Sequence, residues 1–174
     1  MDKLAQENIV DLKDNYEFKP QGKFHIYEVS DDGKRTSVLF EDNLVVSRAR
    51  QILRDLMFSG STDYIISKIK FGDKGQTGTD YINPNPPKLS DTSLYETDIS
   101  LIYEKSTSKE TLDSNKIVYS VRLNKNEANL NGGRFPITEA GLFNNRNEMF
   151  ARKTFPVITK TEDRIYDFEW TIIF

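Results

Sequence analysis

A single histidine and the absence of cysteine set narrow limits on the chemistry of this 174-residue sequence. Without cysteine, one chain forms no disulfide, no thiolate zinc site and no cysteine nucleophile, and one histidine excludes a multi-histidine metal site. A serine–histidine–aspartate triad would have to use His25, which lies in the alternating segment 24–29. We therefore predict that His25 is a strand residue with a satisfied partner or a solvent-facing side chain.

Two carboxylates near the C-terminus could do acid–base chemistry, because glycosidases use two acids about 5–9 Å apart. Asp167 and Glu169 would be about 7 Å apart on one strand. They alternate with aromatic residues, which places them on the face of the strand opposite to those rings. We expect a solvated or cross-strand-paired face, and hydrolysis is the minor alternative.

Two weaker patterns could bind phosphate or a cation. Residues 72–78 are rich in glycine but lack the G-x-x-x-x-G-K-[ST] spacing and precede no helical pattern, so we attribute these glycines to loop flexibility. Four acids could form a weak calcium cluster, although no loop has the ligand order of an EF-hand. We expect no catalytic residue, no cofactor and no metal. The four acids are Asp31, Asp32, Glu41 and Asp42.

Aromatic residues could also bind a ligand, by stacking on sugars or bases. The C-terminal stripe of aromatic residues has the period of a strand, and such a stripe is more often a core face. We expect this stripe to be buried, whereas a carbohydrate-binding module would use exposed rings elsewhere. The stripe comprises Tyr166, Phe168, Trp170 and Phe174, and the other rings include Tyr64, Tyr81 and Tyr103.

The elements that would position these residues are mostly short strands separated by turn residues. In the third predicted strand, alternation places Ile66 on the opposite face from Ile69 and Phe71. Pro156 is predicted to end its strand, because proline cannot donate to a ladder. The predicted strands cover 23–29, 36–40, 64–71, 117–123, 137–143, 149–155 and 166–174, with a hairpin turn over 144–147.

One stretch, over about 45–58, has apolar residues at helical spacing and predicts an amphipathic helix. Ser47 or Asn43 could serve as its N-cap. Gly60 suits the position just past its end, where a left-handed conformation is common.

The predicted domain covers residues 23–174 and follows an extended N-terminal arm over residues 1–22. Its elements predict a mainly β fold, an antiparallel β-sandwich or barrel-like domain with one amphipathic helix packed on it. Two connections, 72–92 and the polar segment 104–115, are unusually long, and long loops are most often functional or disordered. We expect partner binding by the arm and by the first long loop. The candidate residues are Leu4, Ile9, Val10, Leu12, Tyr81, Pro84, Pro86 and Pro87.

Charge and hydropathy argue against two classes of partner. Twenty-four basic and 27 acidic residues give a net charge of −3, so the chain lacks the excess of positive charge that is typical of proteins that bind nucleic acid. No run approaches the ~18 apolar residues of a membrane helix, and the first residues lack the apolar core of a signal peptide. We expect neither nucleic acid nor a membrane as a partner.

Several segments together resemble one class of viral protein. FEDNLVV at 40–46 leads into the helix, the strand over 66–72 ends in Phe-Gly, and ITEAGLF occupies 137–143. With the segments 89–99, 149–160 and 168–174, they resemble tailed-bacteriophage virion proteins. The similarity is to the attachment domains of tail fibres and to related baseplate, neck and capsid-decorating proteins.

The resemblance implies a non-enzymatic structural component of a bacteriophage virion, such as a tail-associated adaptor of the baseplate, the neck or collar, or the fibre attachment. Its partners would be other virion structural proteins, in a symmetric homo-oligomer within the particle. Its location would be the virion, after assembly in the host bacterial cytoplasm. A capsid decoration protein and a carbohydrate-binding module of a tail are the alternatives. Full fibres are expected to continue into a shaft or tip, so a compact adaptor fits a chain that stops where its domain closes.

Overall fold

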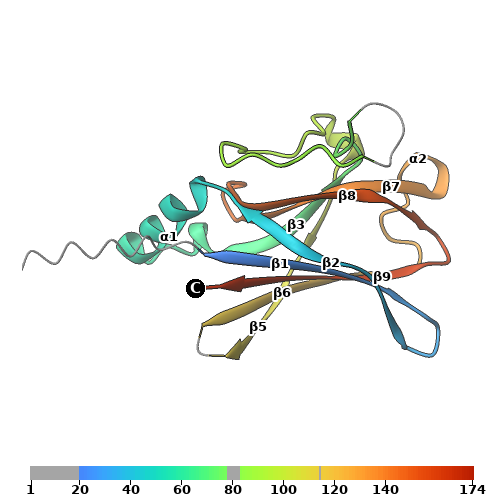
Figure 1. Cartoon of the computed structure of the whole chain (residues 1–174), viewed down its shortest axis with the longest axis horizontal. Helices are drawn as coiled ribbons and strands as arrows, with labels where there is room; N and C mark the ends of the chain where they lie inside the picture. Colours follow the sequence, from blue (N-terminus) through green and yellow to red (C-terminus); the bar gives the residue numbers. More distant parts are fainter. Residues whose placement is uncertain (1–19, 78–82, 114) are drawn as a thin grey trace, which may run out of the picture.

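The computed structural model describes residues 20–77, 83–113 and 115–174 (Figure 1). The predicted arm lies almost entirely outside these residues. The described part is a mainly β structure with one long helix, as predicted. The strands are β1 (Gln21–Val29), β2 (Arg35–Val45), β3 (Ile66–Gly72), β4 (Tyr103–Ser106), β5 (Ser108–Asp113), β6 (Lys116–Leu123), β7 (Arg134–Asn144), β8 (Met149–Thr161) and β9 (Ile165–Ile173). The helices are α1 (Arg48–Ser59), α2 (Leu130–Gly133) and the short 3-10 turns η1 (Thr62–Tyr64) and η2 (Ile99–Leu101).

All neighbouring strands are antiparallel, in the order β4-β3-β7-β8-β2-β1-β9-β6-β5. The order divides into a five-stranded half (β5-β6-β9-β1-β2) and a four-stranded half (β4-β3-β7-β8). The halves join at one corner through only two residue pairs of β2 and β8, Leu44 with Arg152 and Val45 with Ala151. At the other corner β4 and β5 are successive in the chain. The result is a flattened, nearly closed barrel, which confirms the predicted fold class.

The predicted aromatic stripe of β9 faces the inside of this barrel. Phe168 and Trp170 have no exposed surface. The Trp170 ring lies 4.7 Å from the ring of Phe24 on β1, and the Phe168 ring lies 4.6 Å from that of Phe71 on β3, measured between centroids. The Phe168–Phe71 contact joins the two halves of the barrel, whereas the Trp170–Phe24 contact joins neighbouring strands of one half. The prediction that the stripe is core is confirmed, although Phe174 at its end is exposed.

The helix α1 begins three residues later than predicted, because Val45 still belongs to β2. Ser47 occupies the N-cap position, but its side chain makes no capping hydrogen bond. Gly60 adopts the left-handed conformation (φ 61°) just past the helix, as expected. Only Ala49 and Ile52 of the helix are buried, so α1 touches the barrel through a narrow face.

The segment predicted as a second long loop, 104–115, instead contains the strands β4 and β5. Every residue of β5 is exposed, so its sequence has none of the apolar alternation that marks a half-buried strand. β5 is held by backbone pairing with β6, in which Thr111 lies opposite Ile117. The backbone N–H of Thr107 donates to the Ser67 carbonyl and closes this corner of the barrel.

Two strand predictions fail at bulges. The register of β3 against β7 shifts between Ile66 and Lys68, so Ile66 is buried with Ile69 rather than facing away from it. Likewise β8 does not end at Pro156 but continues to Thr161. Pro156 lies within a register shift between β7 and β8, where the ladder does not require its missing N–H.

The hairpin turn predicted over 144–147 is present. Asn147 has a φ of 62°, and the Asn144 side chain accepts hydrogen bonds from the backbone N–H groups of Arg146 and Glu148. Gly33, with a φ of 82°, turns the chain between β1 and β2. Among the described residues, no helix has the length and apolar character needed to cross a membrane.

Candidate functional site

The outer face of β7 and β8 carries a buried ion pair that the sequence did not reveal. Glu139 on β7 and Arg152 on β8 lie diagonally across the ladder, and their side chains pair directly. Neither side chain is more than 1% exposed. Arg152 also bonds to Asp91, with 3.1 Å between Nη1 and Oδ2, and to the Ser93 carbonyl at 3.0 Å.

The same ion pair holds the chain that runs over it. The Glu139 carboxylate accepts the backbone N–H groups of Tyr95 and Glu96 at 2.9 and 2.8 Å. The guanidinium carbon of Arg152 lies 3.4 Å from the centroid of the Tyr95 ring. The segment 91–98 is thereby fixed as an extra layer on the barrel, and the pair has a structural role.

A signal for this pair was present in the sequence. ITEAGLF and MFAR each place one charged residue in an otherwise apolar strand, and buried charges occur almost only in pairs. The structure brings both segments together with segment 89–99. Gly141 permits the approach, because a Cβ there would lie 3.1 Å from Leu94.

The described residues of the first long connection are packed against the barrel. A Cβ on Gly75 would lie 2.3 Å from the Thr138 carbonyl oxygen, and the Gly75 N–H donates to the Thr138 hydroxyl at 2.9 Å. A Cβ on Gly72 would lie 2.7 Å from Glu139. For Gly72 and Gly75 the prediction of loop flexibility is therefore wrong, because both allow backbone to lie directly against β7, whereas Gly78 lies outside the described residues.

Two carboxyl groups meet at the start of this connection. Burial raises the pKa of Asp73 to about 6, and a hydrogen bond to Glu96 adds to the increase. Although burial opposes it, the hydrogen bonds from Asp73 and from the Asp98 N–H lower the pKa of Glu96. The two pKa values shift in opposite directions, so Asp73 is the first of the two carboxyls to take up a proton as the pH falls. The Lys74 ammonium is 3.9 Å from the Glu96 carboxylate.

The predicted partner-binding residues fall into two groups. Pro84 bridges back to Gln76, and the Pro86 carbonyl accepts the Tyr95 hydroxyl at 3.2 Å, so this part of the loop is anchored. Pro86 is exposed, whereas Pro84 and Pro87 are half-buried. The other candidates lie outside the described residues: Leu4, Ile9, Val10, Leu12 and Tyr81.

His25 has the structural role that its sequence context predicts. Its Nε2 lies 2.8 Å from the Ser37 hydroxyl, and its ring stacks on Tyr27 with 3.7 Å between centroids. Burial lowers the pKa of His25 below its ordinary value, so the ring is neutral at pH 7. A neutral, stacked and hydrogen-bonded strand histidine confirms the prediction.

The carboxylates of β9 are paired across strands, as predicted. Arg122 binds Asp167 with two bonds of 2.7 and 2.8 Å. Arg35 contacts Asp167 at 3.1 Å and Glu169 at 2.6 Å. Both acids therefore serve as counter-ions to arginine.

The proposed calcium cluster and the proposed sugar-stacking rings are not assembled. Asp31 and Asp32 lie in the turn after β1, whereas Glu41 and Asp42 lie near the far end of β2. The described part of the chain holds no group of three or more acidic or histidine side chains arranged for a metal. Of the rings, Tyr64 and Tyr103 are partly buried against the core and Tyr81 is not described.

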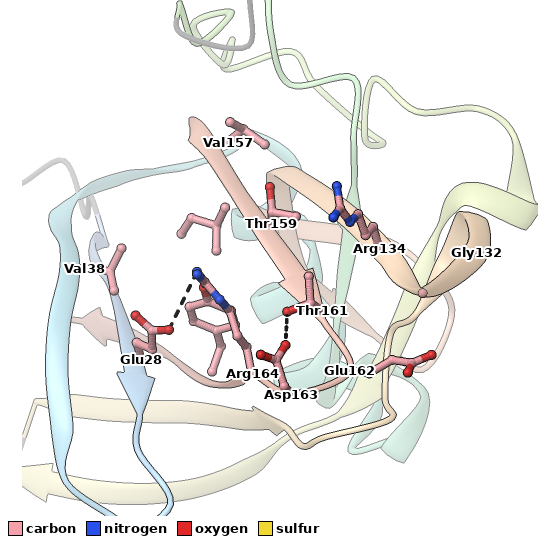
Figure 2. Close-up of a pocket in the computed structure, with 13 residues that line it drawn as sticks. Glu28, Val38, Gly132, Arg134, Val157, Thr159, Thr161, Glu162, Asp163 and Arg164 are labelled. Atoms are coloured by element: carbon pink, nitrogen blue, oxygen red, sulfur yellow. Dashed lines mark hydrogen bonds and ion pairs between the residues drawn. The ribbon is translucent and has the colours of Figure 1, made fainter.

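Among the exposed bulky apolar side chains of the described residues, two pairs lie close together in the sequence. Met57 and Phe58, at the C-terminal end of α1, are 87% and 92% exposed. On β2, Val38 and Phe40 are exposed, and Val38 lines a groove of about 910 Å³ whose other walls include β8 and the turn that follows it. Figure 2 shows Val38 on one side of this groove and Val157 on the other, with Glu28 and Arg164 joined between them. The Glu28–Arg164 contact measures 3.7 Å.

Comparison of the chain with known protein families, with curated proteins and with solved structures gave no match.

Proposed function

We propose that this chain is a non-enzymatic structural component of a bacteriophage virion, a tail-associated adaptor that assembles through protein–protein contacts. Met57 and Phe58 carry the proposal. Two large apolar side chains almost fully exposed side by side are typical of interface anchors, because desolvating them on association is favourable. Figure 1 shows α1 projecting beyond the end of the barrel, where a partner can reach it.

The resemblance of the sequence supports the viral part of the proposal. The segments that carry this resemblance include 89–99 and 137–143. They meet around Glu139 and Arg152, where segment 91–98 is held against the outer face of the barrel. A layer fixed by buried ion pairs presents Pro86 in a defined position, which suits a repeated, symmetric contact. The acids Glu139, Asp167 and Glu169 pair with arginines, and His25 contacts Ser37, so each of these titratable groups has a structural partner.

Purified phage particles test the proposal directly. Mass spectrometry and cryo-EM of particles from a phage that encodes the chain should place it in the tail in several symmetric copies. Location on the head would favour capsid decoration. Absence from particles, or turnover of a defined substrate that Glu169→Gln abolishes, would contradict the proposal.

Two variants locate the contact. Phe58→Asp should leave the thermal transition unchanged, because the ring is exposed, and should prevent incorporation into particles. Leu112→Asp, at an exposed position on β5, is the matched control and should be incorporated normally. Deletion of residues 1–20 should also leave a folded domain that is not incorporated, and normal incorporation would exclude the arm from assembly.

A further inference from the structure

Lys160, near the end of β8, is a lysine buried in the interior of the barrel. It has no exposed surface, and its partner in the ladder, Phe135 on β7, belongs to the hydrophobic core. Among the described residues, its Nζ donates to the Thr161 carbonyl at 2.7 Å and lies 3.5 Å from the Asn129 Oδ1, and no carboxylate forms an ion pair with it. Lysine is almost never fully buried unless it is paired, so this position calls for an explanation.

The surroundings of Lys160 favour its neutral amine. Burial lowers the pKa of this lysine, although the negative charges of Glu127, Asp163 and Glu162 oppose the shift. A neutral amine has a free lone pair on Nζ, whereas an ammonium group has none. A lysine desolvated in an apolar pocket is therefore an activated nucleophile.

Asn129 presents to this amine a group that it can attack. Asn129 occupies the N-cap position of α2, but its side chain makes no capping hydrogen bond. The carboxamide instead faces Lys160, with 3.5 Å between Oδ1 and Nζ. The Asn129 Cγ is one bond of about 1.2 Å from Oδ1, so the amine nitrogen and the carbonyl carbon are near the distance from which such groups react.

The loop over residues 124–129 holds Asn129 there at a conformational cost. Asn126 and Ala128 have φ values of 63° and 53°, and Ala128 is buried, although a left-handed backbone is unfavourable for alanine. The Asn126 N–H donates to the Glu162 carbonyl at 3.3 Å, which fixes the loop beside the end of β8. Figure 2 shows this end of the barrel, where Thr161 ends β8 and Gly132 lies in α2. Strain that the surrounding structure maintains is typical of functional positions.

We propose that Lys160 and Asn129 form an intramolecular isopeptide bond in the folded chain. The Nζ lone pair attacks Cγ, and a Cγ–Nζ bond forms. The Cγ–Nδ2 bond then breaks, and Nδ2 takes one proton from Nζ and leaves as ammonia. The reaction replaces one amide by another, so it needs no oxidant, reductant or second substrate.

Glu127 is the acid that we assign to the proton transfer. It lies two residues before Asn129 in the same loop, and of the three acids it has the largest electrostatic effect on Lys160. Its carboxylate is held in place by an ion pair with Lys105. As a general base, it would accept the proton from Nζ and pass it to Nδ2.

The intact mass of the purified full-length chain, measured under denaturing conditions, tests the proposal directly. The mass should be about 17 Da below that of the sequence, because one ammonia is lost. A protease digest should contain the peptide with Asn129 joined to the peptide with Lys160. The full mass of the sequence, in folded protein kept for days at pH 8, would overturn the proposal.

Three variants show whether the loss of ammonia comes from these two residues. Lys160→Met, which keeps an unbranched apolar stem in the core, and Asn129→Ala should each have the full mass of their own sequence. Lys125→Met is the matched control, because Lys125 is an exposed lysine of the same loop that pairs with Asp31, and it should still lose ammonia.

Two other results would contradict parts of the proposal. A loss of ammonia that persists in Lys160→Met would arise elsewhere, as in a succinimide at Asn131-Gly132, and would overturn the isopeptide bond. Glu127→Gln should be isolated mainly with its full mass, and complete bond formation in this variant would exclude Glu127 from the proton transfer. None of these measurements requires a virion, so their outcome is independent of the proposed function.

Discussion

At the scale of single residues, the most informative side chains are those enclosed by both halves of the barrel. Trp170 is fully buried, and its ring contacts Phe24 across the β1–β9 pair. Within the described part of the chain its Nε1 has no hydrogen-bond acceptor. The indole therefore contributes through packing alone.

Trp170→Ala should lower the free energy of unfolding by about 3–5 kcal/mol, because the cavity would be large and walled by rigid strands. Trp170→Phe should cost less, since the ring contacts remain and no hydrogen bond is lost. Urea denaturation at constant pH measures both values. A near-neutral Trp170→Ala would place the ring on the surface and return it to the list of sugar-stacking candidates.

Glu139→Gln should lower the free energy of unfolding by about 3–5 kcal/mol, because it leaves the buried Arg152 guanidinium without its counter-ion. The double variant with Arg152→Met should cost less than the sum of the two single changes, as a double-mutant cycle in urea would show. Lys116→Met, which breaks the exposed pair with Asp113, is the control and should cost about 0.5 kcal/mol or less. Strict additivity of the buried changes would mean that the two charges do not interact.

At the scale of elements, the connection between β3 and β4 behaves as part of the barrel. Its glycines lie on β7, its segment 91–98 is bound by Glu139 and Arg152, and Leu94 packs with Phe143. The outer face of β7 is thereby buried as well as its inner face. This explains why ITEAGLF reads as a nearly continuous apolar run rather than an alternating one.

The pH dependence of stability should reveal the raised pKa of Asp73 in this connection. Because that pKa is about 6 in the folded chain, the Asp73 carboxyl is more protonated in the folded than in the unfolded chain between about pH 4 and 6. Asp73 therefore stabilises the fold least above pH 6. Asp73→Asn, which stays neutral, should be less sensitive to pH than the unchanged chain and relatively more stable at pH 7. Thermal melts at pH 4.5 and 7 measure this difference, and an unchanged difference would exclude Asp73 as its source.

At the scale of the whole molecule, the barrel is closed unequally at its two corners. One corner is a continuous chain from β4 to β5, and the other consists of two residue pairs between β2 and β8. Strands that lie inside the order, such as β9 between β1 and β6, have neighbours on both sides. Strands at the corners depend on fewer bonds.

Amide hydrogen exchange should follow this order. The amides of β9 should exchange most slowly, because both edges are paired and its inward side chains are core. Those of β5, an exposed strand paired only with β6, should exchange much faster through local opening. Mass spectrometry of deuterated peptides would resolve the two, and equal protection would contradict the topology.

The sequence by itself determined the elements whose apolar residues repeat with a local period. That holds for the core stripe of β9, the helix α1 with Gly60 at its end and the Asn-rich turn, because burial of one face leaves its period in the residues. It also predicted the roles of His25, Asp167 and Glu169, since strand alternation alone separates core from surface.

Only the tertiary structure decided what depends on pairing between distant segments. Three features follow from the pairing register of the backbone, which the sequence of a single strand does not show. They are the exposed strand β5, the continuation of β8 through Pro156 and the burial of Ile66. The Glu139–Arg152 pair and the β2–β8 groove arise where segments far apart in the chain meet. Their existence is a property of the closed barrel, because no local stretch contains both partners.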